Sequence, residues 1–259
     1  MEQEKEVLME KMTWPEIRAA LEKGCTTAVF ACGATEQHGP HLPLSVDAEH
    51  GTVLAEKVAR TLGRALVAPT VRVGCSDHHL AFPGTLSIQK STLEAICRDY
   101  CISLSRHGFR RICIIPSHGG NFSPLAEMLP RLRDAAGTET AVDAFTDLDA
   151  MISLWTQAAE EETGFGNRVG GHADIAESSI MLVLHPEMVR RGQETAGCTE
   201  KPTPEFLARL FREGFRSVSP NGILGDANGM TETIGRRCID GFAGILAAYF
   251  GSRAKDSLS

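Results

Sequence analysis

Three side chains that commonly bind metal ions, those of Glu36, His38 and Asp47, fall within twelve consecutive residues. They follow an apolar run, Thr27–Cys32, that we expect to form a buried strand. Glycine and proline residues between them indicate a loop rather than a helix. Two carboxylates and an imidazole suit a divalent cation. The spacing therefore predicts a metal site at the carboxyl end of a strand, where open α/β sheets bind ligands; the alternative is a solvated polar loop.

A second candidate ligand follows the apolar run Arg111–Pro116, which leads directly into Ser-His-Gly-Gly-Asn at residues 117–121. If the two apolar runs are parallel strands, His118 lies at the same edge of the sheet as Glu36 and His38. The glycine pair lets the backbone pass close to a ligand or turn with positive φ. Asn121 can either cap the helix that follows or hydrogen-bond a ligand.

Two further segments carry polar residues of the kind found in active sites. His172 follows two glycines, and Glu177 stands at the edge of an otherwise apolar helical segment. A carboxylate in that position needs a cation or a set of donors, unless it is an ordinary acidic residue at a helix N-terminus. Ser76 and His79 lie in a loop that ends in Phe-Pro-Gly. This loop is either the wall of a pocket or a structural turn.

Short apolar segments alternate with amphipathic helical ones along the chain. The predicted strands are Thr27–Cys32, Ala65–Pro69, Arg111–Pro116 and Thr140–Phe145. The predicted helices are Trp14–Lys23, Ala48–Leu62, Ser91–His107, Ser123–Ala136, Asp147–Thr163, Ser178–Leu184 and Thr231–Tyr249, and a surface loop is expected at Arg190–Pro204. The alternation is typical of an α/β fold with a mostly parallel sheet flanked by helices on both faces. Ligand-type residues lie on both sides of the midpoint, so we expect a single domain over residues 1–259.

Composition narrows the class of protein and its partners. The chain has 259 residues, is 42% hydrophobic and carries a formal net charge of −7. Lysine and arginine form no basic stripe, which argues against nucleic acid and acidic membrane surfaces as partners. The apolar runs are too short to span a membrane and the charged N-terminus does not resemble a signal peptide, so we expect a cytoplasmic location. The eight cysteines include no C-x-x-C pair and are expected to be free thiols.

Taken together, four motifs resemble the creatininase (creatinine amidohydrolase) family. They are Glu36-Gln-His38-Gly-Pro-His-Leu-Pro-Leu-x-x-Asp47, His79-x-x-Phe-Pro-Gly-Thr85, His118-Gly-Gly-Asn121 and His172-Ala-x-x-x-Glu177-Ser-Ser, and they span nearly the whole chain in the family's order. The resemblance implies a single α/β domain, a homohexamer, and two divalent zinc, manganese or iron ions per subunit. It also implies hydrolysis of a C–N bond, as in creatininase, deformylases of flavin-type biosynthesis and a peptidase of the mycofactocin pathway.

The resemblance also implies roles for individual residues. One ion would be held by Glu36, Asp47 and His118, and the other by His38, the shared Asp47 and Glu177. The remaining roles are our own hypotheses. The expected catalytic residues are His172, which would move a proton to the leaving nitrogen, and Glu177. The expected substrate contacts are Ser76, His79 and Asn121.

Three positions depart from the patterns of the family. Gly120 stands where creatininase proper has a further carboxylate, Arg168 where it has a tryptophan, and Ile175 where many relatives have a glutamate. The first two departures argue against creatinine itself as the substrate. The sequence therefore predicts a metal-dependent amidohydrolase in which a metal-bound hydroxide attacks the carbonyl carbon of a small cyclic amide, a formamide or a related ring carbonyl. Two alternatives stay open, a metallopeptidase that trims a small modified peptide and a non-catalytic metal-binding protein.

Overall fold

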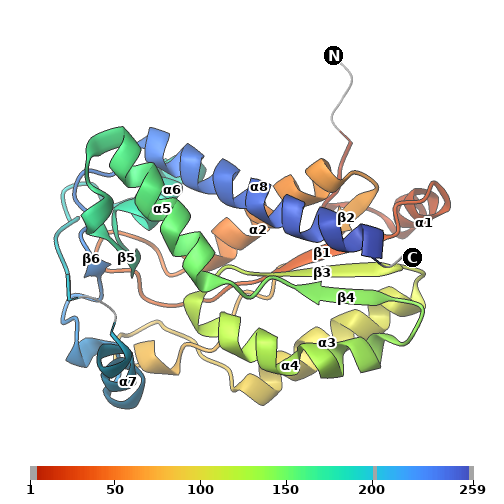
Figure 1. Cartoon of the computed structure of the whole chain (residues 1–259), viewed down its shortest axis with the longest axis horizontal. Helices are drawn as coiled ribbons and strands as arrows, with labels where there is room; N and C mark the ends of the chain where they lie inside the picture. Colours follow the sequence, from red (N-terminus) through yellow and green to blue (C-terminus); the bar gives the residue numbers. More distant parts are fainter. Residues whose placement is uncertain (1–4, 201–202, 257–259) are drawn as a thin grey trace.

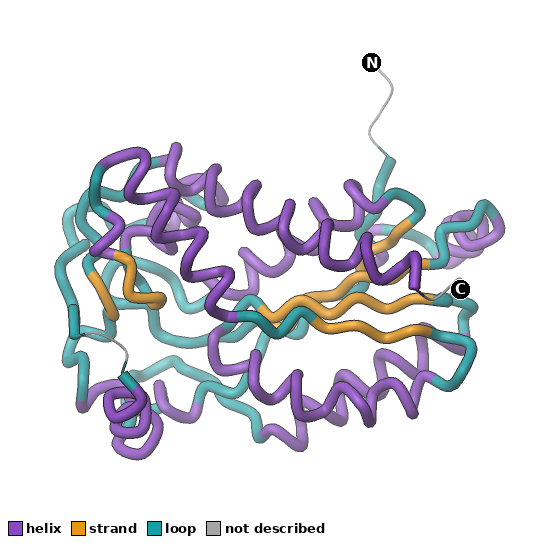
Figure 2. The backbone as a smooth tube through the Cα atoms, viewed as in Figure 1, coloured by secondary structure: helices purple, strands orange, loops and turns teal. Residues whose placement is uncertain are grey.

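The computed structural model describes residues 5–200 and 203–256, and its centre is a parallel sheet (Figures 1 and 2). The strands are β1 (Thr27–Cys32), β2 (Ala65–Val67), β3 (Arg111–Pro116) and β4 (Ala141–Ala144), in the order β2-β1-β3-β4. The central strands β1 and β3 pair from Thr27 opposite Arg111 to Cys32 opposite Pro116, so their carboxyl ends lie together. The predicted α/β fold with a mostly parallel sheet is confirmed.

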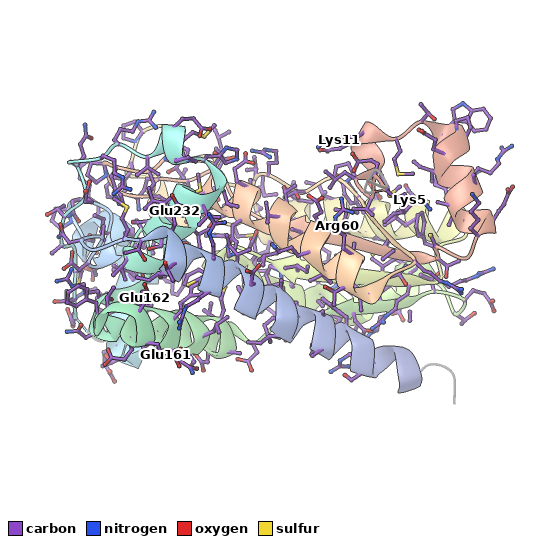
Figure 3. All side chains as sticks on the ribbon, turned by 90° about the horizontal axis from the view of Figure 1, so that it is seen from above. Lys5, Lys11, Arg60, Glu161, Glu162 and Glu232 are labelled. Carbon is purple, nitrogen blue, oxygen red and sulfur yellow. The ribbon has the colours of Figure 1, made fainter. Side chains whose placement is uncertain are left out.

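Helices cover both faces of this sheet, which explains why its strands are apolar on both sides (Figure 1). Val29 and Ala31 of β1 face one core, shared with α2 (Val46–Leu62), α5 (Leu148–Thr163), α6 (Ile175–Leu184) and α8 (Glu232–Asp256). Ala28 and Phe30 face the other core, shared with α1 (Trp14–Glu22), α3 (Lys90–Arg106) and α4 (Phe122–Ala136). Seen from above, α8 runs along α2 and α5, with Glu161, Glu162 and Glu232 near one end of this layer (Figure 3).

The structure adds a region beyond the carboxyl ends of the main strands that the sequence pattern did not reveal. There, β5 (Val169–His172) and β6 (Leu224–Gly225) form a small antiparallel sheet, and α7 (Pro204–Glu213) lies nearby (Figure 1). β5 contains two adjacent glycines and no alternation of apolar residues, so it gave no strand signal. Short 3₁₀ helices are η1 (Met9–Lys11), η2 (Asp77–His79), η3 (Gly119–Asn121), η4 (Gly166–Arg168), η5 (Pro186–Met188) and η6 (Phe215–Ser217).

Most predicted elements are found within a few residues of their expected ends. β1 and β3 match the predicted bounds, whereas α2 begins at Val46, two residues earlier than expected. This shift matters because it places Asp47 in the first turn of the helix. Of the loop expected at Arg190–Pro204, residues 190–200 and 203 are free of helix, with isolated bridges at Ala196 and Cys198, whereas Pro204 is the first residue of α7. All eight cysteines are free, as predicted, and none of the described helices is both long and apolar enough to cross a membrane.

Candidate metal centre

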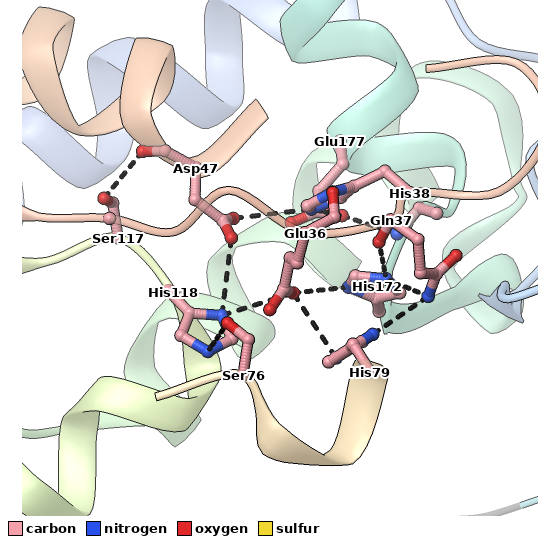
Figure 4. A network of polar contacts seen from close by, with 12 residues as sticks. Glu36, Gln37, His38, Asp47, Ser76, His79, Ser117, His118, His172 and Glu177 are labelled. Atoms are coloured by element: carbon pink, nitrogen blue, oxygen red, sulfur yellow. Dashed lines mark hydrogen bonds and ion pairs between the residues drawn. The ribbon is translucent and has the colours of Figure 1, made fainter. Parts of the chain in front are cut away.

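The side chains of the predicted metal ligands meet in one buried cluster (Figure 4). Glu36 and His38 lie in the loop after β1, Asp47 in the first turn of α2, His118 directly after β3, and Glu177 in the first turn of α6. Their relative exposure lies between 0% and 5%. Residues from distant parts of the sequence therefore converge at the carboxyl ends of the two central strands, the place where open α/β sheets bind ligands.

Glu36, Asp47 and His118 form a first ligand group, in which one atom of each lies within 4.8 Å of the others. His118 Nδ1 is 3.3 Å from Glu36 Oε1 and 3.3 Å from Asp47 Oδ2. Its other nitrogen, Nε2, lies 3.1 Å from the backbone carbonyl of Cys75. Because a carbonyl oxygen only accepts, the hydrogen sits on Nε2, and Nδ1 can offer a lone pair to a cation.

A second ligand group lies beside the first and shares Asp47 with it. His38 Nε2 is 3.5 Å from Asp47 Oδ1 and 3.6 Å from Glu177 Oε2. His38 and Glu177 also form a candidate ligand group with His172, one that does not include Asp47. His38 Nδ1 donates to the backbone carbonyl of Glu36 at 3.0 Å, which leaves the lone pair on Nε2 facing the carboxylates. Asp47 thus presents one oxygen to each group, as a carboxylate that bridges two cations would.

Several buried atoms of these residues have no hydrogen-bond partner, and this observation tests whether the residues fit a pair of cations. The atoms are both carboxylate oxygens of Glu36, Oδ2 of Asp47 and Nε2 of His38. Buried polar groups are normally hydrogen-bonded, and leaving one unpaired costs about 1–3 kcal/mol. All four are atoms through which a metal would be bound. The set fits two divalent cations, which would satisfy every one of them.

The electrostatics of the cluster agree with that fit. Burial disfavours the charged form of His38, but Asp47 and Glu177 raise the pKa of His38 to about 10. Burial also raises the pKa of Glu177 to about 8. Burial opposes ionisation of Glu36 as well, yet the imidazoles of His118 and His79 hold the pKa of Glu36 well below its usual range. Without cations, protons balance the carboxylates, and cations would take the place of those protons.

The turn between β5 and α6 positions His172 and Glu177. Asp174 caps α6, because its Oδ1 accepts from the backbone N–H groups of Ala176 and Glu177 at 2.8 Å and 3.2 Å. Ala173 has a φ of 54°, which is uncommon for a residue other than glycine, and its N–H donates to Glu177 Oε2. A capping aspartate followed three residues later by Glu177 is the usual signature of a helix N-terminus, and this signal could have revealed the role of Asp174.

His172 and His79 face the Glu36 carboxylate. His172 Nδ1 lies 3.6 Å and His79 Nε2 lies 3.4 Å from Glu36 Oε1. Burial lowers the pKa of His172 to about 3 and that of His79 well below its usual range, so both rings are neutral. His79 thus lies beside the proposed ligands, and its contact with substrate stays a prediction. His172 is close enough either to bind a cation or to carry a proton.

The structure places the other two expected substrate contacts differently. Ser76 Oγ lies 3.4 Å from His118 Nε2, the nitrogen that does not face the carboxylates. Asn121 Oδ1 accepts from the N–H of Cys75, and both amide hydrogens go to the backbone carbonyls of Cys32 and the following residue. Asn121 makes no side-chain cap on α4, so that expectation is wrong. Its amide instead ties the loops after β1 and β3 together, which argues against a contact with substrate.

Gly120, one of the departures from the family pattern, has no room for a side chain. A Cβ atom there would lie 2.4 Å from His118 Nε2 and 2.5 Å from the carbonyl oxygen of Cys75. A carboxylate at position 120 would therefore require His118 to move. Glycine at position 120 therefore leaves His118 free to sit where its Nδ1 faces Glu36 and Asp47.

Phe215 packs against two histidines of the cluster and had no signal in the sequence. It lies in η6, is 2% exposed, and its ring stacks on His79 at a centroid distance of 4.2 Å. The same ring meets His172 edge-on at 4.8 Å. Phe215 belongs to a small apolar cluster with Phe206 and Leu210 of α7, which is separate from the two main cores.

Comparison with known proteins agrees with these observations. The profile of the creatinine amidohydrolase (creatininase) family matches residues 10–250. A mycofactocin precursor peptide peptidase of Mycobacterium ulcerans is 33% identical, over 87% of this chain and 80% of that protein. A creatinine amidohydrolase of Pseudomonas putida is 29% identical, over 71% of this chain and 74% of that protein. A crystal structure of creatinine amidohydrolase superposes with a TM-score of 0.75 at 27% identity, covering 95% of this chain and 98% of the other. This chain belongs to the creatininase family of metal-dependent amidohydrolases.

Proposed function

We propose that this protein hydrolyses an amide C–N bond in a small molecule, with cyclic amides and formamides as the first substrate class. The observation that carries the proposal is the set of buried, unpaired ligand atoms on Glu36, His38 and Asp47, arranged on both sides of a shared carboxylate. A non-catalytic site is a weaker interpretation, because structural sites are usually filled completely by protein ligands. Here each group offers about three protein ligands, which leaves positions for water and substrate.

The proposed ligands are Glu36, Asp47 and His118 for one cation and His38, Asp47 and Glu177 for the other. When bound, two divalent cations supply a nucleophile at neutral pH and polarise the carbonyl oxygen of the substrate. The three carboxylates balance most of the charge of the cations, which limits the cost of burying them. Carboxylates and imidazoles accept zinc, manganese and iron alike, so all three belong in the experiment.

The residue that we propose to carry the proton is His172. Its neutral ring has Nδ1 directed toward Glu36, inside the cluster. In hydrolysis, the attacking water gives a proton to Nδ1 while its oxygen forms the new bond to the carbonyl carbon. As the C–N bond breaks, Nδ1 returns that proton to the leaving nitrogen. An open-chain amide or formamide gives a carboxylic acid and an amine, a cyclic amide gives one chain that carries both groups, and His172 ends as it began.

A second candidate function is cleavage of a peptide bond in a small modified peptide. It is favoured by the comparison, because the relative named as a peptidase is more similar to this chain than the named creatinine amidohydrolase. Gly120 and Arg168, which replace groups that creatininase proper uses, agree with a substrate other than creatinine. Both candidates require the same cluster, so the choice between them depends on the substrate alone.

The assembly and location stay predictions of the family resemblance and the composition. We expect a homohexamer in the cytoplasm, acting on a small molecule and binding neither nucleic acid nor membrane. The single stretch over which the family profile matches, residues 10–250, supports one domain.

The experiment that tests the proposed function is a substrate panel with protein of measured metal content. Protein loaded separately with zinc, manganese and iron is incubated with cyclic amides, formamides and short peptides, and the newly formed amine and carboxylate groups are quantified, whether on one product or two. Asp47→Ala is the negative control, and Glu49→Ala, an acidic residue on the same helix, is the matched control that should stay active. If none of the loaded forms hydrolyses any amide or peptide of the panel, the proposal is refuted.

A further inference from the structure

Gln37 lies between two proposed ligands in the sequence, and its side chain joins several groups around the cluster (Figure 4). Its Oε1 accepts from the backbone N–H of Gly39 at 2.9 Å. Its Nε2 lies 3.0 Å from the carbonyl oxygen of Gly222, 3.0 Å from His79 Nδ1 and 2.9 Å from His172 Nε2. One amide with two hydrogens therefore stands among three possible acceptors.

The orientation of this amide is fixed by the backbone groups that it meets. The N–H of Gly39 can only donate, so the atom facing it is the oxygen of Gln37. The carbonyl of Gly222 can only accept, so the atom facing it is the nitrogen. One amide hydrogen is thereby used, and one is left for the two histidines.

The second hydrogen goes to His79, because His172 is a donor at the nitrogen in question. His172 Nε2 lies 2.8 Å from the backbone carbonyl oxygen of Gln37, which can only accept. His172 therefore carries its hydrogen on Nε2 and cannot accept there. His79 Nδ1 is the remaining acceptor, so it bears a lone pair, and the hydrogen of the neutral His79 ring is on Nε2. That Nε2 faces Glu36 Oε1 at 3.4 Å.

We propose that Gln37 is a positioning residue that holds His79 in its Nε2–H form, so that His79 donates a hydrogen bond into the site and does not bind a cation. The other histidines of the cluster present lone pairs at His38 Nε2, His118 Nδ1 and His172 Nδ1. Distance alone would allow Glu36, His79 and His172 to hold a further cation. The hydrogen on His79 prevents this and leaves one N–H donor opposite the proposed ligands.

The segment around Gly222 is shaped for this contact, although it lies far from Gln37 in the sequence. Gly222 has a φ of +80°, and a Cβ atom there would lie 1.9 Å from Gln37 Oε1. Only glycine lets the backbone approach the amide this closely. Gly222→Ala should therefore displace the amide without changing Gln37 itself.

The experiment is nitrogen NMR of zinc-loaded protein labelled with ¹⁵N at histidine, because chemical shifts and couplings show which ring nitrogen carries the hydrogen. In the unchanged protein we expect His79, assigned through its loss in His79→Gln, to carry hydrogen on Nε2. In Gln37→Glu the new carboxylate can only accept, so the hydrogen should move to Nδ1 of His79. His172 is the internal control, because its partner is the backbone carbonyl and its hydrogen should stay on Nε2.

Gly222→Ala is the second variant, and it should replace the single His79 form with a mixture of both. The proposal is overturned if the unchanged protein has hydrogen on His79 Nδ1, or if His79 keeps its Nε2 hydrogen in both folded variants. The spectra need no substrate, so they can support this proposal even if the proposed function fails. For its effect on turnover the proposal rests on that function. Loss of one donor from such a site lowers kcat by about 10²- to 10³-fold, and we expect this in Gln37→Glu when the two proteins are compared at equal zinc content.

Discussion

Replacing Asp47 with alanine should remove both cations, because this carboxylate is the point that the two ligand groups share. Oδ1 faces His38 at 3.5 Å and Oδ2 faces His118 at 3.3 Å, so each group loses one of its ligands. By contrast, Glu36 and Glu177 each contribute a carboxylate to one of the two proposed sites. The defect of Asp47→Ala should therefore affect both sites in the same variant.

The size of the effect can be worked out from ligand linkage. Each site filled at about 100 times its Kd stabilises the folded protein by about 2.7 kcal/mol, so two sites give about 5 kcal/mol. Removing a residue that only hydrogen-bonds to a metal ligand lowers metal affinity by about 10- to 100-fold. Removing a ligand itself should therefore lower metal affinity by at least about 100-fold. At the same metal concentration, the stabilisation of the folded protein by metal then falls to about 1 kcal/mol. For a chain of this size, the rise in Tm on adding metal should fall from roughly 10–20 °C to roughly 2–4 °C.

The assay compares Tm with and without added metal for each variant, together with metal content by elemental analysis. Taking the difference within each variant removes any effect of the substitution on the metal-free fold. Glu49→Ala, which alters an acidic residue two positions away on α2, should keep the full rise in Tm. Retention of two ions by Asp47→Ala, or an unchanged rise in Tm, would refute the shared-carboxylate arrangement.

Three further predictions follow from the same cluster. His172→Ala should keep its metal and lose about 10²- to 10⁴-fold in kcat, and loss of metal instead would make His172 a ligand. At pH 7, metal binding should release protons from His38 and Glu177. Burial lowers the pKa of His38, but the nearby carboxylates raise it to about 10. Burial raises the pKa of Glu177 to about 8. Affinity should therefore rise with pH up to those values, and a calorimetric heat that is the same in buffers of different ionisation enthalpy would contradict this. Phe215→Ala should speed transfer of zinc to a chelator, because the Phe215 ring covers His79. Phe211→Ala, at a 61% exposed position on α7, should not change the rate. Equal transfer rates in the two variants would contradict the proposal that Phe215 covers the cluster.

The sequence was sufficient for the main sheet and for the proposed ligands, and the reason is physical. Strands β1 and β3 are short apolar runs that end where polar residues begin, so parallel pairing alone brings Glu36, His38 and His118 to one edge. Asp47 reaches the same edge because it lies in the first turn of α2, which begins there. Glu177 was a candidate from its place at the edge of an apolar helical segment, but only the family motif gave it the role of a ligand. The small sheet that carries the preceding His172 has two glycines and no apolar alternation, so it gave no strand signal to place Glu177.

Hydrogen-bond direction explains what the sequence could not reveal. Asn121 has the right type and place to contact a substrate, yet its amide is used by backbone groups of two loops. Gln37 is as polar as its neighbours, but its role appears only when the donors and acceptors around it are identified. Phe215 lies nearly 180 residues from Glu36, and no local pattern marks a ring that covers a distant cluster. Such roles depend on contacts between segments, whereas ligand candidates depend mainly on residue type and position along a strand.

The loop after β1 shows why its motif is so specific. Glu36 supplies a side chain to the first ligand group and its backbone carbonyl to His38 Nδ1, so it also orients a ligand of the second group. Gln37 supplies an amide to His79 and its backbone carbonyl to His172. Two consecutive residues, Glu36 and Gln37, thus set the lone pairs or hydrogens of three imidazoles, and Glu36 and His38 are both proposed ligands. A substitution here alters more than one contact at a time. We infer that in this chain the loop after β1 sets both the position of two proposed ligands and the hydrogen positions of the imidazole rings around them.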